Sequence, residues 1–394
     1  MRPLDRLFSA ELRQRLLTLR RDLHRQPELS LEEERTAARL YDELADLRPA
    51  ALDRVAGTGV IARLRGTEPS APTVVLRGDI DALPIQEETD LTYKSEVAGV
   101  MHACGHDVHA AWTVGAAHLL AARPARGDVL ILLQPAEEIG LGARAVLESG
   151  ALDDAATIFG AHVDRRYPVG RVVVQSGPLA AAADTFHIEL SGRGAHAARP
   201  HEGIDPIPGA GALVTALQTI VSRRLPPGTP AVVTVGMLRA GSAPNVIPER
   251  ASLSGTLRSL DPETREVLHA ALHRIAERTA DGHGLEARVI VESGPPPLVN
   301  PEEPAGWARH AVAAALGDGA LARMDAPNMG GEDFAYYLER MPGCFLRIGA
   351  REERGAVIPA HTSRFYAADE AVLVGAAVLA ETARVAAASL SSNG

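Results

Sequence analysis

The stretch Val129-Leu-Ile-Leu-Leu-Gln-Pro-Ala-Glu-Glu138 decides the fold class of this chain. Five aliphatic residues in a row, ending at Gln134 and Pro135, are typical of a strand that is buried on both faces of a parallel sheet. Two adjacent carboxylates then follow where the strand ends. Acidic side chains often mark a solvated helix start, but directly after a buried strand they indicate a polar cleft that tolerates both.

The rest of the first half alternates aliphatic runs with segments of helical periodicity. We expect strands at residues 60–65, 73–76, 129–133 and 157–159. We expect helices at residues 10–24, 31–47, 108–122 and 142–149. Ser30 and Glu33 have the spacing of a capping box at the start of the second helix. This alternation predicts an α/β domain with a mostly parallel sheet that helices cover on both faces.

The middle of the chain predicts a different kind of domain. Its expected order of elements is βαββαβ, which is the ferredoxin-like unit. Asp261 and Pro262 supply an N-cap and first-turn pair for the second helix. The strands are expected at residues 186–190, 231–238, 251–257 and 287–291, and the helices at residues 206–224 and 262–279. We therefore expect a lid or dimerisation domain at residues 181–294, inserted into a metal-binding catalytic domain of residues 1–180 and 295–394.

The length of the chain predicts two domains, and its composition argues against several classes of protein. Single hydrophobic cores rarely grow beyond ~250–300 residues, so a chain of 394 residues is expected to form two domains. The net charge of −10 comes from scattered acidic and basic residues, which argues against a nucleic-acid partner. The uncharged run 371–380 is shorter than the ~20 residues of a membrane span, so we interpret it as a packed helix and expect no membrane partner. Cys104 and Cys344 are the only cysteines, so no disulfide framework is expected and the cytoplasm is the predicted compartment.

Polar side chains follow three of the expected strands at the point where each strand ends. Asp79 and Asp81 follow the strand at 73–76, Glu137 and Glu138 follow the next, and His162 follows the strand at 157–159. In open α/β sheets, ligands bind beyond the carboxyl ends of the strands. We therefore expect these groups to meet at one edge of the sheet.

Cys104 and His106 add a thiolate and an imidazole at a helix start, and His361 stands alone near the C-terminus. Such donors suit zinc or a similar divalent ion, and a spare carboxylate beside them can carry the proton in metal-assisted hydrolysis. Each residue alone has an ordinary alternative. A lone cysteine is usually a small core residue, a lone histidine is usually structural, and strand-end acids often cap the local backbone. His102 and His109 are interpreted as surface or supporting histidines, and the set as a whole predicts a metallohydrolase.

Short motifs run in order along nearly the whole chain. They are Arg20-Arg-Asp-Leu-His24 with Pro27-Glu-Leu-Ser30, Asp79-Ile-Asp-Ala-Leu-Pro84, Met101-His-Ala-Cys-Gly-His-Asp107, Gln134-Pro-Ala-Glu-Glu138, Gly160-Ala-His162, Gly194-Ala-His196, Asn245-Val-Ile-Pro248, Gly255-Thr-Leu-Arg258 and Gly330-Gly-Glu-Asp-Phe334. Any single motif is weak, but the set is specific. Together they resemble the amidohydrolases that include aminoacylase-like N-acyl-amino-acid deacylases, hippurate hydrolase and the indole-acetyl-amino-acid hydrolases.

The resemblance implies a role for each site residue. The implied ligands, which hold two divalent ions per subunit with Cys104 shared between them, are Cys104, His106, Glu138, His162 and His361. The other implied roles are general acid/base for Glu137, an acid bracing the metal site for Asp81, oxyanion stabilisation for the lid histidine His196, and substrate carboxylate binding for Asn245 and Arg258. The resemblance also implies a homodimer through the lid, with His196 acting in its own subunit or across the dimer.

This chain departs from the family pattern at a few positions. Asp79 stands where the wider superfamily has a histidine ligand, Arg193 and Ala195 stand where glycines are frequent, and Ala360 stands where leucine is common. The first departure argues against a metal role for Asp79. The second changes the lid motif around His196, and the third weakens the assignment of His361 as a ligand.

The implied reaction is hydrolysis of the amide bond of an N-acyl amino acid, releasing a carboxylic acid and a free amino acid. Zinc is the expected metal, with manganese, cobalt and nickel as alternatives. The alternative functions are a small-peptide carboxypeptidase or dipeptidase of the same fold, and a catalytically silent metal-binding protein. A nucleobase deaminase is disfavoured because the chain has no Cys-x-x-Cys pair.

Overall fold

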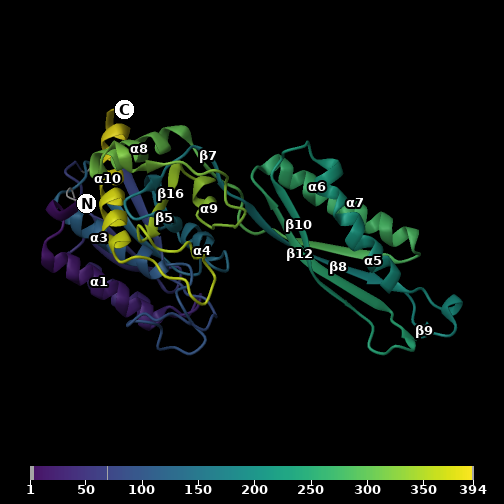
Figure 1. Ribbon diagram of the computed structural model, residues 1–394. Coiled ribbons are helices and arrows are strands. Elements are labelled where there is room, and N and C mark those ends of the chain that lie inside the picture. Colours follow the sequence, from purple (N-terminus) through teal and green to yellow (C-terminus); the bar gives the residue numbers. More distant parts are fainter. Residues whose placement is uncertain (1–3, 69, 393–394) are drawn as a thin grey trace. The chain divides into compact units, whose positions relative to one another are not determined.

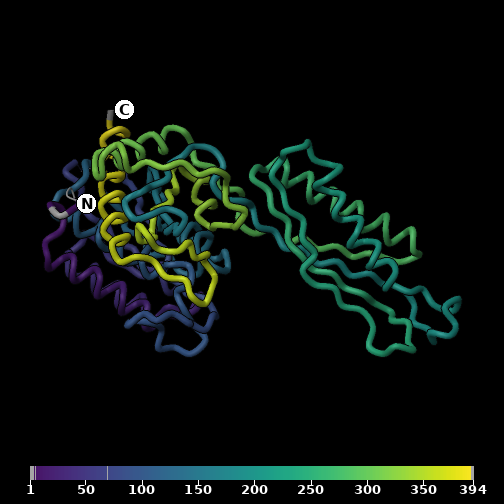
Figure 2. Tube along the Cα trace, in the orientation of Figure 1, coloured from purple at the N-terminus to yellow at the C-terminus, as the bar shows by residue number. Residues whose placement is uncertain are grey.

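The computed structural model describes residues 4–68 and 70–392, and the chain divides into two compact units. Unit 1 consists of Met1–Gly177, Asn300–Asp325 and Tyr336–Gly394, and unit 2 of Pro178–Val299 and Ala326–Ala335. The purple N-terminal part and the yellow C-terminal helix both belong to unit 1 (Figures 1 and 2). Unit 1 is therefore built from segments on both sides of the insertion.

An eight-stranded sheet forms the centre of unit 1, in the order β1-β2-β4-β3-β5-β16-β6-β15. Its strands are β1 (Ala51–Val55), β2 (Gly59–Leu64), β3 (Thr73–Asp79), β4 (Val129–Gln134), β5 (Ala155–Pro168), β6 (Val172–Val173), β15 (Leu321–Ala322) and β16 (Gly343–Arg351). The four central strands β4, β3, β5 and β16 run parallel, whereas β2 and β6 join them antiparallel. Every residue of β3 and β4 is buried, so both faces of the sheet are covered. The predicted α/β class is confirmed.

Helices cover the sheet of unit 1. They are α1 (Ala10–Arg25), α2 (Glu34–Ala45), α3 (His106–Ala122), α4 (Gly142–Glu148), α8 (Glu302–Leu316), α9 (Ala335–Leu338) and α10 (Glu370–Ser392), with short 3₁₀ turns η1 (Leu4–Arg6) and η3 (Asp318–Ala320). By length and composition α10 is apolar enough to cross a membrane, but 78% of its most apolar window is buried inside the protein. It packs against α3 and α8. Its apolar side chains therefore belong to the core of unit 1.

The expected capping box at the start of α2 is wrong. The helix begins at Glu34, and Glu33 makes no side-chain cap. The Ser30 hydroxyl instead donates to Asp81, and the Glu33 carboxylate accepts hydrogen bonds from Thr58 and from the backbone of Ala136. These tertiary partners replace the local ones because Ser30 and Glu33 face the ends of β3 and β4.

Unit 2 contains a four-stranded antiparallel sheet in the order β10-β12-β8-β13. Its strands and helices are β8 (Ala182–Ser191), α5 (Pro206–Leu217), α6 (Thr219–Arg224), β10 (Ala231–Ala240), β12 (Arg250–Ser259), α7 (Pro262–Gly282) and β13 (Glu286–Glu292). This is the βαββαβ order predicted from the sequence, although the first helix is divided at Gln218. Asp261 caps α7 as predicted, since its carboxylate accepts the Thr264 N–H at 2.7 Å.

Smaller elements complete unit 2 and its connections. A two-stranded ribbon pairs β9 (Ala195–His196) with β11 (Val246–Ile247), and the turn η2 (Pro200–Glu202) follows β9. Where the chain passes between the units, β7 (Gly177–Ala180) and β14 (Leu298–Asn300) pair with each other. The chain segments at the crossings 177–178 and 299–300 therefore run side by side.

Candidate metal centre

Cys104 and His106 lie on either side of Gly105, at the start of α3. Gly105 is the N-cap of that helix and has a φ of +87°, in the left-handed region that favours glycine. A Cβ atom at this position would lie 2.6 Å from Cγ2 of Val163. Only glycine therefore lets the chain turn here into α3 while it packs against Val163 of β5.

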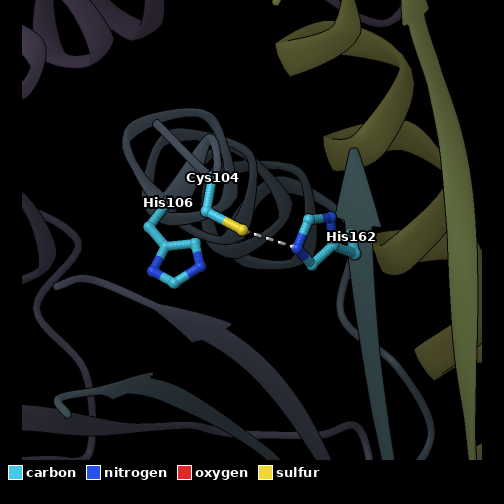
Figure 3. A group of neighbouring side chains, drawn as sticks. All are labelled: Cys104, His106 and His162. Atoms are coloured by element: carbon cyan, nitrogen blue, oxygen red, sulfur yellow. Dashed lines mark hydrogen bonds between the residues drawn. The ribbon is translucent and has the colours of Figure 1, made fainter. Parts of the chain in front are cut away.

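The predicted donors from four parts of unit 1 meet at the carboxyl ends of the parallel strands. Ligand atoms within 4.8 Å of one another form three overlapping groups: Cys104, His106 and His162; Cys104, Glu138 and His361; and His106, Glu137 and Glu138. In Figure 3, Cys104 points its sulfur at the ring of His162 on β5, and the ring of His106 lies beside it. The sulfur is 3.2 Å from Nε2 of His162. Residues from 104 to 361 thus converge on one small volume.

Hydrogen bonds fix the orientation of both buried imidazoles. Nδ1 of His106 lies 3.1 Å from a carboxylate oxygen of Asp81, and Nδ1 of His162 lies 2.8 Å from the carbonyl oxygen of Val163. Both partners only accept, so each Nδ1 carries the proton. The Nε2 atoms then face the donor group. Carboxylate or carbonyl bonds of this kind commonly orient histidines that ligate metals.

The turn after β4 supplies the carboxylates. Nε2 of His106 lies 3.9 Å from Glu137 and 3.8 Å from Glu138, and the other oxygen of Glu138 lies 3.4 Å from Nε2 of His361. Ala136 has a φ of +53°, and its N–H donates to Glu33 at 2.9 Å. Glu33 therefore stabilises a strained turn that directs both neighbouring carboxylates to the site.

The donor atoms fit divalent metal ions. Among the described residues, Nε2 of His106 and Oε1 of Glu138 are buried without a hydrogen-bond partner. A buried polar atom left unpaired costs about 1–3 kcal/mol, which a bound cation would offset. Burial raises the pKa of the Cys104 thiol well above its usual range and lowers the pKa of His162 well below its own. Without metal the sulfur keeps its proton, and a bound ion would displace it.

A second layer of buried polar residues supports the site. His109 was expected to be a surface or supporting histidine, and it is fully buried. Its Nδ1 is hydrogen-bonded to the carboxylate of Asp79, and its Nε2 accepts the Val163 N–H at 2.9 Å. Asp79 also pairs with Arg77. Against the effect of burial, the neighbouring side chains of His106, His109 and Arg77 hold the pKa of Asp79 well below its usual value. Asp79 and His109 therefore tie the end of β3 to the interior of β5.

Asp107 does not orient a ligand histidine. Its carboxylate accepts from Arg20 at 2.7 Å and from His24 at 2.9 Å, both on α1. Asp81 fills the orienting role, since it bonds His106, the Ser30 hydroxyl and the Glu138 N–H. Alternation along an extended chain places Asp79 and Asp81 on one side, but it cannot tell which of them meets His106.

The three predicted lid residues lie in unit 2. His196 on β9 pairs with Val246, and the carbonyl of Asn245 accepts the Ala197 N–H at 3.0 Å, so His196 and Asn245 are neighbours. Arg258 and Arg250 lie near opposite ends of β12. Arg250 pairs with Ser191, the last residue of β8, and the chain continues from Ser191 into β9. One copy of unit 2 thus places His196 and Arg258 at opposite ends of its sheet.

Three buried arginines of unit 1 were not singled out from the sequence: Arg77, which pairs with Asp79, and Arg165 and Arg347. Arg347 on β16 pairs in register with His162 and is 6% exposed, and its positive charge contributes to lowering the pKa of that histidine after burial and His109. Arg165 lies three residues beyond His162 on β5 and is also buried. A charged residue inside an otherwise aliphatic strand was the available signal for Arg347.

Comparison with known proteins gives one consistent result. A model of the family described as peptidase family M20/M25/M40 matches residues 75–385. The N-acetyl-L-cysteine deacetylase of Bacillus subtilis is 44% identical over 89% of this chain and 84% of its own length. The N-acetylcysteine deacetylase of the same organism is 41% identical over 94% of this chain and 96% of its own. A crystal structure of the Bacillus subtilis YXEP protein, described as a dinuclear metal binding peptidase, is 36% identical with a TM-score of 0.85 and covers 96% of this chain and 99% of that one.

Proposed function

Because this chain belongs to peptidase family M20/M25/M40, and is thus a hydrolase of the amidohydrolase type, we propose that it cleaves the amide bond of N-acyl amino acids. The products are a carboxylic acid and a free amino acid. The names of the two deacetylases support a small acyl group such as acetyl on the substrate. The family and the overlapping donor groups support two divalent ions per subunit.

One observation carries the proposal: the Nε2 atoms of His106 and His162 face a sulfur that also belongs to the group with Glu138 and His361. We assign Cys104, His106, Glu138, His162 and His361 as the ligands, with Cys104 shared. Zinc is our proposed metal because thiolate and imidazole donors suit it. When bound, two such ions supply Lewis-acid chemistry and lower the pKa of water towards ~7.

Glu137 is our proposed general acid/base. Its carboxylate lies 3.9 Å from Nε2 of His106, and its side chain is 11% exposed, so it adjoins the ligands and still contacts solvent. In the proposed reaction it accepts a proton from the attacking water and then gives that proton to the nitrogen of the leaving amine. Asp81 keeps His106 oriented throughout.

Unit 2 is proposed to bind the substrate and to form a dimer. We assign His196 to the developing oxyanion and Asn245 and Arg258 to the substrate carboxylate. The edge strand β10 exposes Met237 and Leu238, each nearly half accessible, which supports pairing with a second copy. Because His196 and Arg258 lie at opposite ends of the sheet, a dimer in which each copy lends His196 to the other fits this assignment.

The decisive experiment is a substrate panel. The purified protein, stripped of metal and then given zinc, manganese, cobalt or nickel, is incubated with N-acetyl and N-benzoyl amino acids and with dipeptides. Release of free amino acid from the N-acyl compounds, lost in Glu137→Gln, supports the proposal. Cleavage of dipeptides alone would instead assign a small-peptide carboxypeptidase or dipeptidase. Light scattering coupled to size exclusion tests the dimer, and a monomer overturns that part.

A cytoplasmic location is part of the proposal. Both cysteines are buried and unbridged, and the proposed shared thiolate is protected from oxidation where thiols are kept reduced. Fractionation of the source cells tests this location.

A further inference from the structure

Of the proposed ligands, His361 lies farthest along the chain from any helix or strand. It lies in the segment 352–369 between β16 and α10, which is yellow-green to yellow in Figure 1. Segments longer than about 12–15 residues without regular structure are uncommon in compact domains and often functional. His361 also has a φ of +63°, in the left-handed region. A residue other than glycine keeps this backbone conformation only where the surrounding structure supports it. Contacts from other elements must therefore hold this segment in place.

The guanidinium of Arg165 supplies that support. Arg165 is 3% exposed and lies on β5, the strand that carries His162. It donates to the carbonyl oxygens of Ala356 and Tyr366, each at 2.9 Å, and to the carboxylate of Glu352 at 3.0 Å. It also lies 4.1 Å from the centre of the Tyr366 ring.

The two carbonyl bonds are placed symmetrically about the ligand. Ala356 and Tyr366 stand five residues before and five residues after His361. One planar side chain therefore closes the base of the loop 356–366, with His361 at its middle. Near the middle, the His361 N–H donates to the carbonyl of Ala103 at 2.8 Å, next to Cys104. The loop is thus fixed at its base by Arg165 and at its tip beside the proposed shared ligand.

We propose that Arg165 is a positioning residue for the metal centre, which holds loop 356–366 closed and thereby presents His361 to the ion position shared with Cys104 and Glu138. Arginine suits this task because its rigid fork donates to several acceptors at once, whereas lysine has a single charged point on a flexible stem. The inference rests on the proposed function only in assigning His361 as a ligand. It adds a residue of β5 that acts on a segment about two hundred positions later.

The first test measures the loop without any metal. Arg165→Lys is compared with Arg166→Ala, a matched control on the same strand whose side chain pairs with Asp164. Metal-free proteins are digested briefly with trypsin, and cleavage after Arg354 and Arg364, which flank His361, is followed by mass spectrometry. We expect cleavage at least tenfold faster in Arg165→Lys than in the parent or the control. Equal rates in all three overturn the closure.

The second test measures metal binding. Zinc is titrated into metal-free parent, Arg165→Lys, His361→Ala and the double variant, and bound zinc is counted. Changes in residues that support ligands typically cost about 10–100-fold in affinity. We expect Arg165→Lys to weaken one of the two ions by that factor, and to cause no further loss when His361 is already alanine. Equal weakening of both ions, or additive losses in the double variant, refutes action through His361.

These two tests separate the inference from the proposed function. A parent protein that binds no zinc rejects the proposed metal centre, while the digestion still decides whether Arg165 closes the loop. Should Arg165→Lys fail to fold, Tyr366→Leu removes the ring beside the guanidinium and keeps the backbone carbonyls. It is expected to change digestion and zinc binding in the same direction by a smaller factor, and no change in either measurement contradicts the inference.

Discussion

Replacing Cys104 with serine is expected to weaken both ions of the proposed metal centre. Its sulfur belongs to the donor group with His162 and also to the group with His361. Serine is close to cysteine in size, so the packing of this buried position changes little, but a hydroxyl does not ionise to replace the thiolate at neutral pH. Replacing His162 or His361 with alanine should instead weaken mainly one ion.

The size of the effect follows from linkage. An ion present at about 1,000 times its Kd stabilises the folded state by about 4 kcal/mol, so two ions contribute about 8 kcal/mol. Unit 1 contains roughly 260 residues, and at ~2.1 cal/mol/K for each residue its unfolding entropy is about 0.55 kcal/mol/K. Losing both ions should therefore lower its Tm by about 15 °C, and losing one ion by about 7 °C.

The assay is calorimetry of each variant with excess zinc and again with a chelator. With excess zinc, the Tm of Cys104→Ser is expected to lie close to that of the parent protein with chelator. The Tm values of His162→Ala and His361→Ala should lie about halfway between those of the parent with chelator and the parent with zinc. With chelator, all four proteins should melt within a few degrees of one another. If the serine variant loses the stabilisation of one ion only, the shared role of Cys104 is refuted. If the Tm of the serine variant lies below that of the parent by the same amount with chelator as with zinc, the sulfur contributes to packing and not to metal binding.

Three further predictions concern other parts of the chain. Glu137→Gln should lower kcat by about 10²–10⁴-fold while metal analysis still finds two ions, and near-normal turnover would remove Glu137 from its proposed role. Asp184→Asn should destabilise unit 2 by about 3 kcal/mol in urea unfolding, because this buried carboxylate binds Arg265, His269 and the Gly294 N–H. Asp184 has a lowered pKa, so the difference should be lost as the pH falls through that value; a difference fully retained in strong acid contradicts this. Gly105→Ala should cost about 1–2 kcal/mol for the left-handed conformation alone, and more for the Val163 contact, and an unchanged Tm would show that the turn relaxes.

The parts of the fold that were predicted have strong local signals. Strands β3 and β4 are buried on both faces, so their aliphatic runs stand out from the flanking sequence. Strand β16 is absent from the expected strands, because Arg347 interrupts its apolar run. Strands β6 and β15 have two residues each, which is too short for any periodicity. Their position depends on neighbours that are distant in sequence.

The site was predictable where strand ends determine it. Asp81, Glu137 and Glu138 follow the central parallel strands β3 and β4, and such strands end at one edge of a sheet. His162 was expected just after a strand at 157–159, but β5 extends to Pro168 and His162 lies within it. His361 follows no such element, so only the resemblance to a family pointed to it. The Ser30 and Glu33 spacing shows the limit of local patterns. The same two residues fit a helix cap or tertiary partners, and the cap lost because Asp81 and Ala136 lie within reach.

The position of β16 has a consequence for synthesis on the ribosome. This strand lies between β5 and β6, yet it is encoded after the whole of the inserted unit. At about 5–20 residues per second, a nascent chain needs roughly 10–35 s after completing β5 at residue 168 to reach β16 at residue 343. During that interval the flank of β5 that later receives β16 is an open sheet edge, which other chains can join. Slow translation before Gly343 therefore prolongs a stage at which this protein is prone to aggregate, and a nonsense codon before Gly343 leaves that edge of β5 open permanently.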